Sequence, residues 1–146
     1  MTFIKKHWFF IVFLVTLLCS AYLLILNSDR KSLYSGNGLW KDYTIETITI
    51  EGKKRRLVLA DSPERWTKGL MYVRKPTPNF EGMIFKFPDK QPRLFWNQNT
   101  LETLTIYWLA EGKVIGQSTL PSIEISKKIV TVQSPAPADT VVEIIQ

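Results

Sequence analysis

A chain of 146 residues has room for one domain and an additional segment. Its single histidine, His7, and single cysteine, Cys19, lie near the N-terminus, which excludes thiol nucleophiles, histidine-based triads and Cys/His zinc sites from the rest. The formal net charge is +6, and subtracting Lys5 and Lys6 leaves +4, too little to indicate a nucleic-acid partner. We therefore expect no metal and no cofactor.

Residues 8–26 contain no charged side chain and predict a transmembrane anchor. A helix rises about 1.5 Å per residue, so this segment reaches roughly the 30 Å thickness of a bilayer core. A secretory signal usually has a shorter apolar region of about 7–15 residues, and cleavage after Ala21 would leave an apolar new terminus. A cleaved signal and a buried soluble helix are the alternatives to an uncleaved anchor.

The charges that flank this segment bear on its orientation. Lys5 and Lys6 precede it, and Arg30 and Lys31 follow it, so the two sides have equal numbers of positive charges and the positive-inside rule gives no preference. The terminal amine and the short tail favour an N-terminus inside the cell. The predicted organisation is a cytoplasmic tail, a single-pass anchor, a flexible tether and a β-rich extracytoplasmic domain, at residues 1–7, 8–26, 27–42 and 43–146.

The first elements of the predicted domain are a hairpin and a short helix. Residues 44–50 alternate apolar and polar side chains, residues 56–60 form a second strand, and Gly52 lies in the turn between them. The basic run at 53–56 then falls at the hairpin tip. A helix of about two turns follows near residues 62–69, because Ser62 suits the N-cap, Pro63 the first turn and Gly69 the position after the last turn.

The remaining segments predict short strands separated by turn signals. They lie at residues 82–87, 93–97, 104–110, 113–120, 129–134 and 140–146. Eight strands against one helix predict a mainly β domain, α+β at most. We expect it to be a compact antiparallel barrel or sandwich.

Three motifs in fixed order carry a resemblance to a known family. They are ADSPERWTKGLM (60–71), EGMIFKFP (81–88) and FWNQNT (95–100). The chain resembles the domain of unknown function 192 family, whose members are small β-rich envelope domains without an established activity. The family typically has FWMKNT and then Leu-Asp. Here Asn97 and Gln98 stand in place of the Met and Lys, and Thr105 stands in place of the Asp, so both charges are absent. Within the motifs, the residues expected to shape the fold are Ser62, Pro63, Gly69, Leu70, Met71, Gly82, Met83, Phe85, Phe87 and Phe95.

The FWNQNT motif supports two interpretations. Strand alternation places Trp96 on one face and Asn97 on the other. In the structural interpretation, Trp96 is core, and Asn99 with Thr100 fastens the following loop. In the binding interpretation, an aromatic platform and adjacent amides bind a neutral polar ligand such as a glycan, or a protein. The candidate binding residues are Trp96, Asn97, Gln98, Asn99, Thr100, Tyr107 and Arg65, although an ion pair is the simpler role for Arg65.

The leading functional hypothesis is a non-catalytic domain that binds or assembles at the outer face of the membrane. Its predicted partners are the lipid bilayer, through residues 8–26, and an envelope glycan or membrane protein. The alternative is a hydrolase or lyase that acts on envelope glycans with carboxylates alone, for example Glu81 with Glu102. The motif also predicts that Asn99→Ala destabilises the domain, whereas Asn97→Ala and Gln98→Ala are close to neutral.

Overall fold

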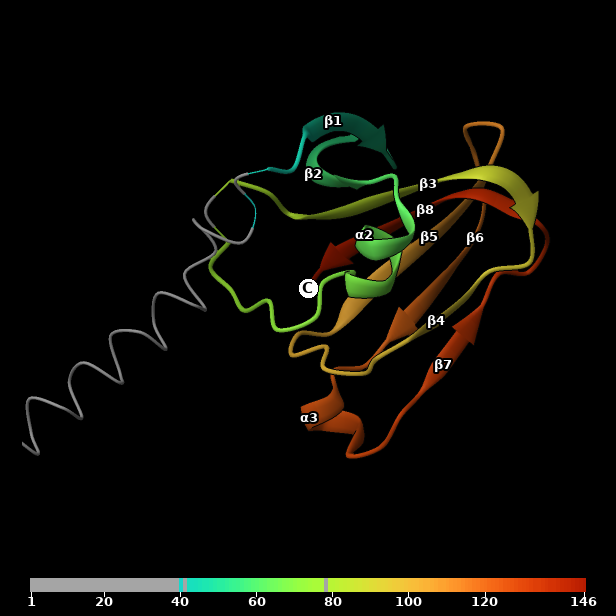
Figure 1. The fold of residues 1–146 in the computed structure, drawn as a ribbon. Coiled ribbons are helices and arrows are strands. Elements are labelled where there is room, and N and C mark those ends of the chain that lie inside the picture. Colours follow the sequence, from blue (N-terminus) through green and yellow to red (C-terminus); the bar gives the residue numbers. More distant parts are fainter. Residues whose placement is uncertain (1–39, 41, 78) are drawn as a thin grey trace, which may run out of the picture.

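The computed structural model describes residue 40, residues 42–77 and residues 79–146 (Figure 1). The predicted anchor at 8–26 and most of the tether lie outside these residues. No helix among the described residues is long and apolar enough to cross a membrane.

Eight strands and two short helices make up the described part of the chain, which confirms a mainly β fold. The strands are β1 (Ile45–Ile50), β2 (Lys53–Ala60), β3 (Gly82–Gln91), β4 (Leu94–Trp96), β5 (Leu104–Ala110), β6 (Lys113–Leu120), β7 (Thr131–Gln133) and β8 (Ala138–Ile145). The helices are α2 (Pro63–Lys68), which was predicted, and α3 (Ile123–Ser126), which was not.

Six strands form one sheet in the order β1-β2-β3-β8-β5-β6, and β4 pairs with β7 in a second sheet. Among the described strands, β1 and β6 are the edges of the large sheet, so it does not close into a barrel. The expectation of a purely antiparallel arrangement is also wrong, because β2 and β3 are parallel. A parallel pair needs a crossover connection, and the segment containing α2 provides it.

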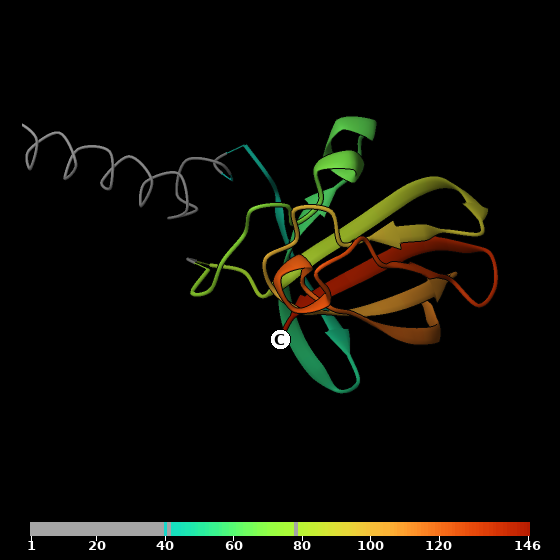
Figure 2. The same cartoon turned by 90° about the horizontal axis from the view of Figure 1, so that it is seen from below.

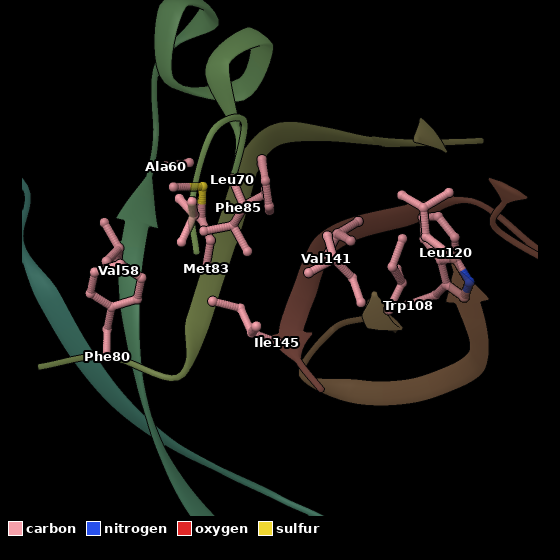
Figure 3. Close-up of a cluster of buried hydrophobic side chains, with 13 residues drawn as sticks. Val58, Ala60, Leu70, Phe80, Met83, Phe85, Trp108, Leu120, Val141 and Ile145 are labelled. Carbon is pink, nitrogen blue, oxygen red and sulfur yellow. The ribbon is translucent and has the colours of Figure 1, made fainter. Parts of the chain in front are cut away.

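Local signals fix both ends of α2. The Ser62 hydroxyl accepts a hydrogen bond from the Arg65 backbone N–H at 3.4 Å, and Pro63 occupies the first turn. Gly69 ends the helix with φ at +48°, a conformation that side chains with a Cβ disfavour. The chain therefore leaves α2 toward the sheet and places Leu70 in the core beside Phe85 and Met83 (Figure 3).

The two faces of the large sheet bury two separate apolar clusters. On β5, Ile106 and Trp108 belong to the cluster beneath α2 and β4, while Tyr107 and Leu109 belong to the opposite cluster. The same alternation holds on β8, where Val141 and Val142 lie in different clusters. Figure 2 shows α2 on one side of the sheet and the β1–β2 hairpin extending to the other.

The β1–β2 hairpin has the predicted turn, with Gly52 at φ +74°. The basic residues 53–56 are not at its tip, however. They form the first half of β2 and pair with residues 47–50 of β1.

The second sheet covers the cluster beneath α2. Phe95 on β4 packs edge-on against Phe85 and Trp108, with ring centroids 4.9 and 5.6 Å apart. Phe95 is therefore the core residue of its strand, which leaves the neighbouring Leu94 and Trp96 outward, at 64% and 49% exposure.

Candidate functional site

The FWNQNT motif begins with a buried structural amide, Asn97. Its side chain is 0% exposed. Its Nδ2 donates to the backbone oxygen of Pro121 at 2.9 Å and to the Ser126 hydroxyl at 2.8 Å, and its Oδ1 accepts from the Val130 N–H at 2.8 Å. The sequence suggests Asn97 as a candidate ligand contact. In the structure Asn97 connects β4 to the segment around α3, so we assign it a structural role.

The next residues attach the motif to other parts of the fold. Asn99 has φ at +56°, and its carbonyl accepts from the Tyr72 N–H, just after α2, at 2.9 Å. Thr100 is buried, and its carbonyl accepts from the Ile123 N–H at the start of α3. Asn99 and Thr100 thus connect neighbouring segments through their backbone carbonyls, whereas the motif predicts fastening by their side chains.

Trp96 and Tyr107 do not form a shared platform. Trp96 is half exposed on β4, so the interpretation of Trp96 as core is also wrong. Tyr107 lies in the opposite apolar cluster, and its hydroxyl donates to the Glu51 carboxylate at 3.0 Å. Strand alternation explains the separation, because successive side chains of β5 point to opposite faces of the sheet.

The central strand β8 carries a buried carboxyl group, Glu143, on the face covered by α2 and β4. The residue is 4% exposed, and its Oε2 has no hydrogen-bond partner among the described residues. Its neighbours across the sheet are Met83 on β3 and Ile106 on β5, both apolar. Burial raises the pKa of this carboxyl from its ordinary 4.5 to about 8, because the charged form is poorly solvated there.

Glu143 lines a small cavity of about 30 Å³, which we call the Glu143 pocket. Its wall comes from the end of α2, including Gly69 and Leu70, and from Phe85 and Phe95. The FWNQNT motif contributes further lining residues, Trp96, Gln98 and Thr100. The pocket therefore joins three of the candidate residues to a carboxyl group from the far end of the chain.

A larger open depression adjoins the pocket, and we call it the aromatic groove. Its volume is about 250 Å³, and it shares Trp66, Phe95 and Trp96 with the Glu143 pocket. Phe87 and Leu94 also line the groove, as does Arg93, whose guanidinium lies 3.8 Å from the Phe87 ring centroid. The groove is thus a largely aromatic surface with one cation, and it shares part of its wall with the pocket of the buried acid.

The charged candidates have structural partners instead. The Arg65 guanidinium pairs with Asp61 at 2.8 Å and lies 4.6 Å from the Tyr43 ring centroid, which confirms the ion-pair interpretation. Glu81 pairs with Arg55, and Glu102 accepts from the Lys75 backbone N–H at 3.1 Å.

The described residues contain no group of three or more His, Cys, Asp or Glu side chains that could hold a metal ion.

Residues 46–146 match the family described as uncharacterized ACR, domain of unknown function 192. The chain belongs to this family. The match confirms the resemblance carried by the three motifs, and it includes Glu143 and both depressions. No curated protein matches the chain.

Two solved structures share the fold of this domain of unknown function 192 member. One is a protein from Sinorhizobium meliloti described as a candidate transcription regulator, with 27% identity, a TM-score of 0.54, and coverage of 70% of this chain and 79% of that chain. The other is a protein of unknown function from Novosphingobium aromaticivorans, with 24% identity, a TM-score of 0.56, and coverage of 70% and 73%.

Sequence reasoning missed Glu143, although a signal for it exists. In the run VVEII it is the single charged residue among apolar neighbours, and charged residues are almost never fully buried unless paired. Such a residue is a candidate for function, since a buried acid without a partner destabilises the fold and needs another reason to be there.

Proposed function

We propose that this chain is a membrane-anchored, non-catalytic domain that binds a neutral, polar glycan of the cell envelope in the aromatic groove and the Glu143 pocket. Residues 8–26 form the anchor, with the N-terminus inside the cell and the domain outside. The observation that carries the binding proposal is the unpartnered Oε2 of Glu143, which lines a pocket whose wall is shared in part with the aromatic groove.

The exposed aromatic surface supports this proposal. Trp96 is half exposed beside the more exposed Leu94, and both line the groove. The Trp66 ring packs against Phe87 at 4.9 Å, and its N–H donates to the Ala60 carbonyl, so the far side of the groove is held in place. Flat apolar rings with a few polar groups are typical of sites that bind sugars, because sugar rings have apolar faces and polar edges.

Co-sedimentation of the detergent-solubilised full chain with isolated cell-wall sacculi tests the proposal. We expect the wild type to pellet with sacculi and Trp96→Ala to lose at least tenfold in affinity. Val114→Ala is the matched control, because Val114 is similarly exposed but lies on the edge strand β6. Equal binding by wild type and Trp96→Ala, or no binding by either, would contradict the proposal.

Glycan hydrolysis is the second candidate, because a carboxyl with a pKa of about 8 is protonated at neutral pH and suits a general acid. Glycosidases usually use a pair of carboxyl groups. Glu143 is the one acidic residue among the described residues that line the pocket, so binding is favoured. If the wild type released reducing ends from sacculi and Glu143→Gln did not, hydrolysis would be favoured over binding.

A further inference from the structure

The Glu143 pocket has chemical features that narrow the choice of ligand. The neighbouring strands and the loop after β4 contribute apolar or neutral groups near the carboxyl: Met83 and Phe85 from β3, Ile106 from β5, and Gln98 and Thr100 from the loop. Lys68 at the end of α2 is the other charged residue that lines the pocket. Its ammonium group lies over the Trp40 and Tyr43 rings, 5.0 and 5.5 Å from their centroids.

The carboxyl of Glu143 is consequently neutral at pH 7. A carboxyl that lacks a nearby cation and solvent takes up a proton, and desolvation is the cause of its raised pKa. A protonated carboxyl has one O–H that donates and one carbonyl oxygen that accepts. It therefore offers both kinds of hydrogen bond side by side, with no charge.

A secondary amide can pair with this acid and remain neutral. It is planar and trans, so its N–H and carbonyl point to opposite sides, and one hydrogen bond forms, in which the amide carbonyl oxygen accepts from the acid O–H. The pocket volume of about 30 Å³ suits one small group. The methyl of an acetamido group would meet the apolar lining formed by Leu70, Phe85 and Phe95.

The position of the pocket relative to the aromatic groove completes the argument. Both depressions share Trp66, Phe95 and Trp96, so a group in the pocket is attached to whatever lies in the groove. We propose that the Glu143 pocket receives the acetamido group of an N-acetylated amino sugar whose ring packs in the aromatic groove. This inference rests on the proposed glycan binding and adds the group that is recognised.

Three tetrasaccharides with the same linkage test the inference by calorimetry on the detergent-solubilised full chain. They are the β-1,4-linked tetramers of N-acetylglucosamine, of glucose and of glucosamine, which carry an acetamido group, a hydroxyl and an amine at the same carbon. At pH 6.5 we expect the acetylated tetramer to bind at least tenfold more tightly than the other two. Preference for the amine would overturn the proposal, because it would show an ionised carboxylate.

The pH dependence of the same binding gives a second measurement on the unmodified chain. Between pH 6.5 and pH 9.5 the carboxyl loses its proton, so binding of the acetylated tetramer should weaken at least tenfold. Glu143→Gln keeps one donor and one acceptor, and it should bind equally at both pH values. Glu111→Gln, a change at an exposed surface glutamate, should behave as the wild type.

The outcomes separate this inference from the proposed function. If all three tetramers bind equally and without pH dependence, glycan binding stands and recognition of the acetamido group is refuted. If none of them binds while sacculi are retained, the acetamido proposal also fails. If neither the tetramers nor sacculi bind, the proposed function itself is refuted. The comparisons on the wild type remain decisive even if Glu143→Gln does not fold.

Discussion

The Asn97 side chain supplies hydrogen-bond partners to backbone groups of several chain segments that would otherwise lack a partner. It bonds the Pro121 carbonyl and the Val130 N–H, which lie 24 and 33 residues further along the chain. Asn97→Ala should therefore destabilise the domain by about 1–3 kcal/mol for each buried group left unpaired. The free energy of unfolding in urea measures this cost.

Gln98→Ala is the control for Asn97→Ala, because Gln98 is partly exposed at the pocket. We expect its unfolding midpoint to stay close to that of the wild type. Asn97→Ala should therefore be the more destabilising of the two variants, which reverses the expectation from sequence that Asn97 is dispensable. Equal midpoints for Asn97→Ala and wild type would show that the buried bonds of Asn97 contribute little.

Glu143 makes the stability of the domain depend on pH. Its folded pKa of about 8 lies above the ordinary 4.5, so between these values the folded state holds a proton that the unfolded state has released. Stability is highest below pH 4.5 for this group and falls by about 1.4 kcal/mol per pH unit up to about pH 8. Glu143→Gln should flatten this decline, and urea unfolding across pH 5 to 8 checks it.

At the scale of elements, Gly82 shows why one motif requires glycine. A Cβ at this position would lie 1.8 Å from the backbone oxygen of Glu143, so β3 approaches β8 too closely for any side chain. Gly82→Ala should lower stability by several kcal/mol or prevent folding, since neither strand can move without disturbing the sheet.

Gly69 provides the comparison for Gly82. A Cβ there would meet the Phe85 ring at an ordinary 3.6 Å, and the φ of +48° is the main obstacle. We expect Gly69→Val to cost about 1–3 kcal/mol, less than Gly82→Ala. Thermal melts of both variants give the order, and an unchanged midpoint for Gly69→Val would contradict it.

The elements that sequence predicts correctly are those with local signals. Ser62, Pro63 and Gly69 define α2, and alternating or apolar runs separated by turn signals identify the eight strands. The pairing of β2 with β3 in parallel has no such signal, because it depends on how the intervening segment crosses the sheet. Asn97 and Glu143 are similar cases, since their roles come from segments that are distant in sequence.

For the whole molecule, the proposed anchor gives a prediction about topology. An alkaline phosphatase fused after Gln146 should be active in intact cells, because this enzyme needs an oxidising compartment to form its disulfides. Cell fractionation should recover the fusion with membranes. Replacing two residues of the apolar segment, Leu17 and Leu18, with arginine should abolish membrane retention, because charges at a helix centre oppose insertion. An active fusion in the cytosolic fraction would contradict the proposal.

The central place of β8 between β3 and β5 has a consequence for assembly of the domain. The strand latest in chain order joins the two halves of the large sheet, so neither half has its full set of backbone partners before β8 is inserted. The same strand delivers Glu143 to its pocket. The proposed recognition therefore requires the finished domain, because the acid lies on the strand that completes the large sheet.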